Sequence, residues 1–317
     1  MSEQNNNWER GVLEKLAMSA IQEQRRARHW GIFFKVLTFG YLFFLLFLFM
    51  DWTGGKAEKA LGGKHTALVE MDGVIASNSV ASADNIISGL QDAFKDKKTQ
   101  GVILRINSPG GSPVQAGYIN DEIRRLRGKY PNIPLYVVVE DMCASGGYYV
   151  AAAADKIFVN KASMVGSIGV LMDGFGFTGT MEKLGVERRL MTAGENKGFL
   201  DPFSPLNPRH QEFIKQMLDE VHQQFIAVVK QGRGKRLKET ADTFSGLIWT
   251  GQKSIELGLA DEIGSVESVA RDVIKAEDIV DFTAHEGIAD RLAKRFGAGV
   301  ASALPGFSMQ ANGIRLR

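Results

Sequence analysis

An almost uninterrupted apolar run near the amino end constrains this chain most. Residues 31–50 read GIFFKVLTFGYLFFLLFLFM, and Lys35 is their only charged residue. Twenty helical residues span about 30 Å, the thickness of the hydrocarbon layer of a bilayer. Phe and Leu would occupy every face of such a helix, which therefore lacks the polar stripe of a helix at the surface of a soluble core. The run predicts one transmembrane helix, assigned to residues 31–52.

The flanking charges predict its orientation. Residues 1–30 contain five Lys and Arg residues, against Lys56 and Lys59 on the other flank. Basic residues accumulate on the cytoplasmic side, so we expect a cytoplasmic tail over residues 1–30 and the rest of the chain outside the cytoplasm. A cleaved signal peptide is the alternative. Its apolar stretch would be shorter, begin nearer the first residue and end at a small-residue cleavage site. We expect a retained anchor.

The chain after a linker at residues 53–64 is typical of an α/β protein. Strand-like segments alternate with helix-like segments, the strands at 66–76, 101–107 and 134–140 and the helices at 82–96, 112–129 and 146–155. Short apolar strands separated by amphipathic helices indicate βαβ units and a mostly parallel sheet with helices on both faces. We predict one folded domain over residues 65–283 and a loosely held tail over residues 284–317.

A long amphipathic helix is predicted at residues 208–230. Its apolar residues recur at steps of three and four, at Phe213, Ile214, Met217, Leu218, Val221 and Phe225. A stripe of this kind faces either the core or another subunit.

Composition excludes several classes of function. The formal charge of +2 is too small to indicate a nucleic-acid partner. Cys143 is the single cysteine, so no internal disulfide can form, and we expect it to be a small buried residue. No spacing of Cys, His or carboxylate residues resembles a ligand set, and we therefore expect neither a metal nor a cofactor.

Two glycine-rich segments follow predicted strands. RINSPGGS occupies residues 105–112, and CASGGYY occupies residues 143–149. Function gathers at the carboxyl ends of parallel strands, and glycine N–H groups there can stabilise a developing negative charge. Ser145 is then either a nucleophile or an ordinary helix cap. Neither the sequence pattern of a phosphate-binding loop nor the G-x-S-x-G pattern is present. The spacing of residues alone therefore does not decide whether Ser145 is a nucleophile or a helix cap.

A serine nucleophile needs a base. The five histidines are His29, His65, His210, His222 and His285, and none falls in a glycine-rich strand end. A lysine can replace histidine where burial favours its neutral amine. The sequence alone does not show which lysine is buried.

Four ordered segments carry a specific resemblance. INSPGGS, CASGGYYVAAAADKIFVN, MVGSIGV and WTGQKSIELGLADEIG, in this order and at these separations, resemble the signal peptide peptidase A (SppA) family of membrane-anchored serine proteases. The resemblance covers residues 65–281. It implies the α/β fold of the ClpP and crotonase-like proteins, with repeated ββα units, and a Ser-Lys dyad in place of a triad.

The resemblance also implies roles for individual residues. Ser145 is the expected nucleophile, and Lys197, in a segment of the A-G-x-x-K type, is the expected general base. Ser167 of the G-S-I-G motif should orient the lysine amine. Gly146 and Gly110, together with Gly111, should supply the oxyanion donors.

The resemblance further implies an endopeptidase that hydrolyses membrane-released peptides, such as signal-peptide remnants, through an acyl-enzyme. We expect it in a bacterial cytoplasmic membrane, with its catalytic domain in the periplasm or extracytoplasmic space. Because this chain has one domain, we suggest a homo-oligomeric ring in which Lys197 of one protomer serves Ser145 of a neighbour. The alternatives are a SohB-type protease with another substrate, a crotonase-like acyl-CoA enzyme and a non-catalytic scaffold.

Overall fold

A computed structural model describes residues 15, 18–19, 21–46 and 63–284. The chain divides into two compact units, Met1–Gly62 and Gly63–Arg317, each described here by itself. In the first, Ile21–Leu46 form one helix that is long and apolar enough to cross a membrane. It begins before the apolar run of the sequence. The last residues of the expected span, nearly all of the expected linker and the tail from residue 285 lie outside the described residues.

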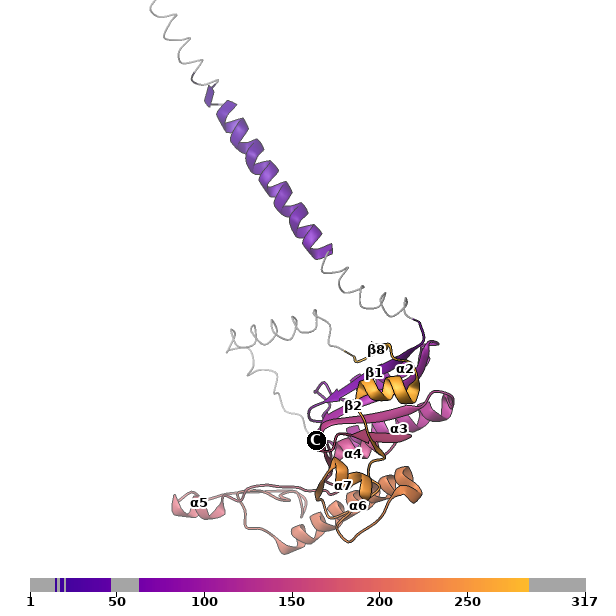
Figure 1. Ribbon diagram of the computed structural model, residues 1–317. Coiled ribbons are helices and arrows are strands. Elements are labelled where there is room, and N and C mark those ends of the chain that lie inside the picture. Colours follow the sequence, from indigo (N-terminus) through magenta and orange to yellow (C-terminus); the bar gives the residue numbers. More distant parts are fainter. Residues whose placement is uncertain (1–14, 16–17, 20, 47–62, 285–317) are drawn as a thin grey trace, which may run out of the picture. The chain divides into compact units, whose positions relative to one another are not determined.

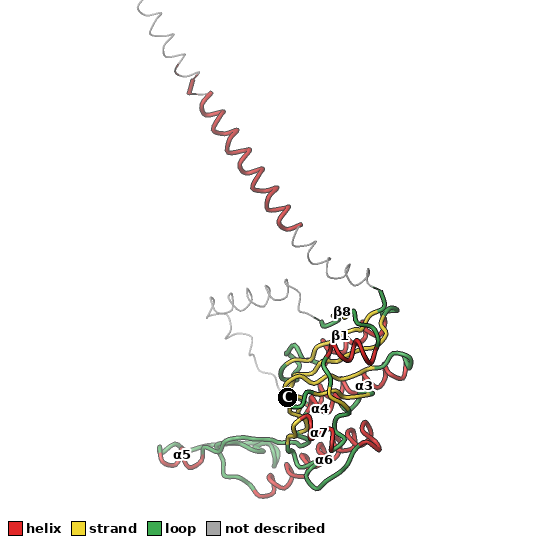
Figure 2. The backbone as a smooth tube through the Cα atoms, in the orientation of Figure 1, coloured by secondary structure: helices red, strands yellow, loops and turns green. Residues whose placement is uncertain are grey.

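The second unit is built on one eight-stranded sheet, shown in Figures 1 and 2. Six strands follow the order β6-β5-β3-β2-β1-β8, and β4 and β7 continue the sheet from β3. Every pairing is parallel except that of β5 with β6, which confirms the predicted α/β class with a mostly parallel sheet. The strands are β1 (His65–Asp72), β2 (Thr99–Ser108), β3 (Leu135–Ala144), β4 (Lys156–Val159), β5 (Met164–Gly166), β6 (Ile248–Thr250), β7 (Glu262–Ile263) and β8 (Ile279–Asp281).

Strand β3 has two successive neighbours on one side. Its first half pairs with β4, where Tyr136 aligns with Lys156, and its last residues pair with β5, where Ala144 aligns with Gly166. The carboxyl end of β3 therefore meets β5 directly. This fork brings two of the resemblance motifs, which the sequence separates by about twenty residues, to one edge of the sheet.

Three helices cover one face of the sheet: α2 (Ala83–Lys95), α3 (Pro113–Lys129) and α4 (Gly146–Ala151). Ser82 and Ser112 cap α2 and α3 by accepting hydrogen bonds from backbone N–H groups of the first turn. The apolar side chains beneath the helices are fully buried and form the main core, as at Leu90, Leu104, Ile119, Val137 and Val150.

Among residues 63–284, helical segments cover the second face over the first half of the strands. There α8 (Val266–Ser268) and the π-helical turn η2 (Val269–Ile274) pack on Leu68, Ile103, Val138 and Phe158. Farther along the strands this face carries charge, because Arg105 pairs with both Glu70 and Glu140. Helical segments thus pack on both faces, as expected, and within the described residues those on the second face are shorter.

The predicted long helix is confirmed as α6 (Pro208–Arg233). Its apolar stripe is divided: Phe225 is buried in the core, whereas Phe213 and Met217 are exposed. Before α6, the chain from about residue 170 makes an extension that contains α5 (Thr178–Lys183) and projects from the sheet layers in Figure 1. After α6 come η1 (Gly234–Arg236) and α7 (Gly251–Glu256).

A buried ion pair fixes the carboxyl end of α6. Arg233 is 1% exposed, and its Nη1 and Nη2 donate to both carboxylate oxygens of Asp261 at 2.9 and 2.8 Å. Asp261 also accepts a hydrogen bond from Ile157 N at 2.7 Å. Burial alone would raise the pKa of the Asp261 carboxyl, but the hydrogen bonds and charge of Arg233 outweigh burial, and the pKa is lowered.

Arg233→Met should therefore lower the free energy of unfolding by about 3–5 kcal/mol, because it removes the buried partner of a largely buried carboxylate and leaves it only the exposed Arg236, 3.2 Å away. Arg271→Met, which breaks an exposed pair with Asp272, is the matched control and should cost under about 1 kcal/mol. Urea denaturation of the full chain in detergent measures both. The parent should also lose this contribution as pH falls below about 4, since Asp261 has a lowered pKa when folded. Equal losses in the two variants would contradict the assignment.

Candidate active site

Ser145 occupies a strained turn between β3 and α4. Its φ and ψ are +50° and −123°, a backbone conformation that costs a non-glycine residue about 1–3 kcal/mol. Ser145 N donates to Gly166 O at 2.9 Å, and Ser145 O accepts from Tyr149 N at 3.0 Å. The side chain makes no capping hydrogen bond. Although Ser145 stands where a helix cap is expected, its hydroxyl does not act as one.

The loop after β2 presses against this turn. Gly110 and Gly111 have φ of +99° and +147°. A Cβ on Gly110 would lie 2.7 Å from Gly146 N and from Ser145 Cβ, and one on Gly111 would lie 2.2 Å from Ile75 O. Only glycine fits both positions. Gly110 N donates to Ser108 Oγ at 3.1 Å, whereas Gly111 lines the pocket described below.

Ser167 lies in a second turn, directly after β5. Its φ is +51°, its N donates to Leu247 O at 2.7 Å, and its O accepts from Gly169 N at 2.9 Å. Because β5 pairs with the end of β3, this turn lies next to the Ser145 turn. Two serines, each with a left-handed backbone, therefore stand at the carboxyl ends of neighbouring strands.

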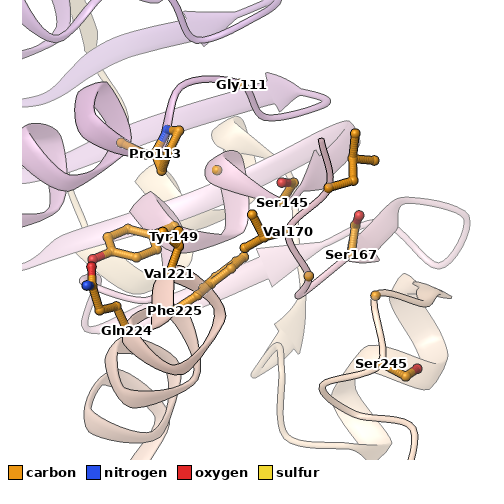
Figure 3. Close-up of a pocket in the computed structure, with 15 residues that line it drawn as sticks. Gly111, Pro113, Ser145, Tyr149, Ser167, Val170, Val221, Gln224, Phe225 and Ser245 are labelled. Atoms are coloured by element: carbon orange, nitrogen blue, oxygen red, sulfur yellow. The ribbon is translucent and has the colours of Figure 1, made fainter. Parts of the chain in front are cut away.

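A pocket of about 590 Å³ opens in front of both serines, as Figure 3 shows. Its size is in the usual range for small-molecule and peptide side-chain sites. One wall carries Ser145, Gly146, Gly111 and Ser167, and the rest is largely apolar, including Pro113, Ala116, Tyr149, Val221 and Phe225. The rings of Tyr149 and Phe225 lie 5.2 Å apart, and burial raises the pKa of the Tyr149 hydroxyl. A hydroxyl on a strained turn beside glycine N–H groups suits acyl transfer.

Lys197 is not brought to this pocket. It is exposed on the extension between β5 and α6, where its N donates to Gly194 O, and it is not among the pocket-lining residues. The structure thus places Ser145, Ser167, Gly111 and Gly146 around one cavity, puts Gly110 just behind it, and leaves Lys197 apart from all of them.

The single cysteine lies near the candidate nucleophile. Cys143 is buried beneath the Ser145 turn, and burial raises the pKa of its thiol. Over residues 21–46 and 63–284, no three His, Cys, Asp or Glu side chains lie close enough together to hold a metal ion.

Comparison with known proteins identifies the family. The model of peptidase family S49 matches residues 128–279, which include Ser145, Ser167 and Lys197. A protein from Enterococcus faecium provisionally named signal peptide peptidase SppA is 30% identical over 237 residues, covering 72% of this chain and 68% of that protein. The chain belongs to peptidase family S49. The SppA resemblance of the sequence is confirmed, as is the fold class it implied.

Two further relatives are longer than this chain. A protein from Arabidopsis thaliana named chloroplastic serine protease SPPA is 27% identical over 216 residues, covering 68% of this chain and 32% of its own length. A Brucella abortus protein named Na⁺/H⁺ antiporter NhaA is 45% identical over 193 residues, covering 61% of this chain. The chain spans about a quarter of that protein, 26%, so the antiporter name assigns no activity to the matched segment.

Replacing Gly110 should damage this S49 site. Gly110→Ala should lower the free energy of unfolding by roughly 1–3 kcal/mol, because its Cβ would enter the Ser145 turn from a backbone that disfavours side chains. Gly117→Ala, in α3 with nothing within 4 Å of its Cβ, should instead stabilise by about 0.5–1 kcal/mol. Urea denaturation of both variants checks this, and a Gly110→Ala protein as stable as the parent would show that the loop does not press on the turn.

Proposed function

We propose that this S49 peptidase is a membrane-anchored serine endopeptidase that acts through a Ser-Lys dyad. The observation that carries the proposal is the strained turn at Ser145. Its hydroxyl makes no helix-capping hydrogen bond, and the residue lines a pocket together with Gly111, Gly146 and Ser167. The name of the Arabidopsis relative, a serine protease, and that of the Enterococcus relative support the same reaction type.

The proposed reaction begins with attack of Ser145 Oγ on the carbonyl carbon of the scissile peptide bond. The hydroxyl proton passes to a neutral lysine amine, and the oxyanion accepts hydrogen bonds from backbone N–H groups. We assign these donors to Gly111 and Gly146, because Gly110 N–H is engaged by Ser108. The protonated amine then gives its proton to the leaving nitrogen, and water hydrolyses the acyl-serine by the reverse sequence of proton transfers.

The proposed base is Lys197, supplied by a neighbouring protomer. A lysine acts as a base only where burial disfavours its ammonium form. Lys197 is exposed on the single chain, and so are apolar side chains of the same extension, among them Leu171, Phe175 and Met191, which are 81%, 79% and 92% exposed. Apolar surface of this extent calls for a covering partner. A second copy would cover it, remove Lys197 from water and present the amine to a Ser145 that lacks one.

We further propose a single-pass anchor in a bacterial cytoplasmic membrane, with the amino terminus in the cytoplasm and the peptidase domain in the periplasm or extracytoplasmic space. The helix Ile21–Leu46 and the basic residues before the apolar run support this topology.

The largely apolar pocket fits apolar peptide segments such as signal-peptide remnants. A SohB-type protease would use the same dyad on a different substrate and remains the alternative. S49 membership favours peptide hydrolysis over the acyl-CoA chemistry of crotonase-like enzymes.

The dyad predicts a clear mutational pattern. Ser145→Ala and Lys197→Ala should each lower kcat/KM on a quenched apolar peptide by about a thousandfold or more, because they remove the nucleophile and its base. Lys183→Ala, an exposed lysine of the same extension, should retain activity. Parent activity should rise with alkaline pH, as more of the base is neutral. Activity in Lys197→Ala would move the base elsewhere, and activity in Ser145→Ala would end the serine protease proposal.

The shared dyad predicts complementation. Mixing Ser145→Ala with Lys197→Ala protein should restore part of the parent's activity, because some sites then combine an intact Ser145 with an intact Lys197 from a neighbour. Each variant mixed with itself is the control. Assemblies shown by differential tags to contain both chains, yet without activity, would place the base in the same chain as its nucleophile.

A further inference from the structure

The turn that carries Ser167 is held from three directions. Gly166 O accepts from Ser145 N, and Ser167 N donates to Leu247 O. The third bond comes from a side chain: His222 Nε2 lies 3.1 Å from Ile168 O. The first two bonds tie the turn to the nucleophile and to the loop before β6. The third ties it to α6, the helix whose Val221 and Phe225 form the far wall of the pocket.

The direction of this third bond follows from its acceptor. A carbonyl oxygen only accepts, so His222 Nε2 must carry the proton. The imidazole can donate in this way both as the neutral Nε2–H tautomer and as the imidazolium. The bond therefore persists whether or not the ring is charged, which suits a fixed support.

Ile168 is the point through which α6 reaches the turn. Its side chain is fully buried in the core, and its main chain lies between Ser167 and Gly169, which both line the pocket. Gly169 N donates a hydrogen bond to Ser167 O at 2.9 Å, which closes a tight turn around Ile168. If the Ile168 carbonyl loses its donor, the peptide that follows can rotate to find another, and both Ser167 and Gly169 would move with it.

We propose that His222 is a positioning residue of the active site, which sets the orientation of Ser167 through the Ile168 carbonyl without touching the substrate. The inference rests on the proposed function, together with the role that the SppA resemblance implies for Ser167, which is to orient the lysine amine. Nothing in the sequence pattern connects His222 with the site, because it lies 55 residues after Ser167 on a separate helix. The feature that could have pointed to it is its position on α6, one helical turn before Phe225, which lines the pocket.

The test compares, in the full chain, replacements of His222 that keep a hydrogen-bond donor with apolar replacements that remove it. His222→Leu and His222→Met remove the N–H group, whereas His222→Gln retains one near the same place. We measure kcat and KM with the quenched peptide, normalised to serines titrated by a fluorophosphonate, and thermal unfolding alongside. Gln223→Leu, on the exposed side of the same helical turn, is the matched control.

His222→Leu and His222→Met should lower kcat per titrated serine about tenfold, the usual effect of one lost hydrogen bond to a buried group, with KM within about threefold of the parent. His222→Gln should stay within about threefold of the parent in both constants. Deuterium exchange of the peptide spanning residues 164–170 should rise in the apolar variants and remain at the parent's level in His222→Gln.

Three outcomes would overturn the inference while leaving the proposed function intact. Apolar variants that match Gln223→Leu in kcat would show that the bond is unimportant. A Gln variant as impaired as Leu would show that the donor is not what matters. Apolar variants that both fail to fold would assign His222 a structural role. If instead the parent does not cleave, or Ser145→Ala cleaves as well as the parent, the proposed function itself fails and the inference fails with it.

Discussion

The buried contact between Arg233 and Asp261 determines where α6 lies, and α6 forms one side of the candidate active site. Such a pair is costly to desolvate, and it is tolerated here because Asp261 also accepts from Ile157 N and Arg233 also donates to Gly258 O. At the residue before Arg233, a Cβ on Gly232 would lie 1.9 Å from Ala152 O. Helix α6 therefore contacts the backbone at the end of α4. The helix that starts at Ser145 and the helix that walls the pocket are thus fixed to each other.

The two serine turns depend on each other in the same way. A left-handed backbone at Ser145 is maintained because Gly166 accepts its N–H, and Gly166 immediately precedes the left-handed Ser167. The glycines of the loop after β2 close the arrangement from the other side. Strain of this kind survives only where the surroundings over-determine the backbone, and here strand pairing, core packing and glycine contacts all do so. The absence of glycine at residue 143 excludes the G-x-S-x-G pattern but not the sharp strand-to-helix turn that this pattern produces elsewhere.

Much of this could be predicted from the sequence where the signal was local. The apolar runs of β1 to β3 and the helical patterns of α2, α3 and α6 predicted those elements, and the glycine-rich strand ends drew attention to Ser145 and to the loop of Gly110 and Gly111. Strands of two to four residues such as β4, β5 and β7 carry too little periodicity to be recognised. The sequence could not distinguish Gly110 from Gly111 as a donor, because that depends on a hydrogen bond to Ser108. Nor could it show that the first half of the α6 stripe is uncovered, since an apolar stripe looks the same facing a core or a partner.

The exposed half of α6 and the extension that carries Lys197 belong together physically. Phe199 packs on Phe213 with ring centroids 5.7 Å apart, so the segment two residues from Lys197 rests on the exposed end of the helix. Any surface that covers Phe213 therefore also approaches Lys197. Under the proposed function, this couples the activity of the base to assembly. A lone chain leaves Lys197 exposed and apart from the pocket of Ser145, and assembly would bring the two residues together.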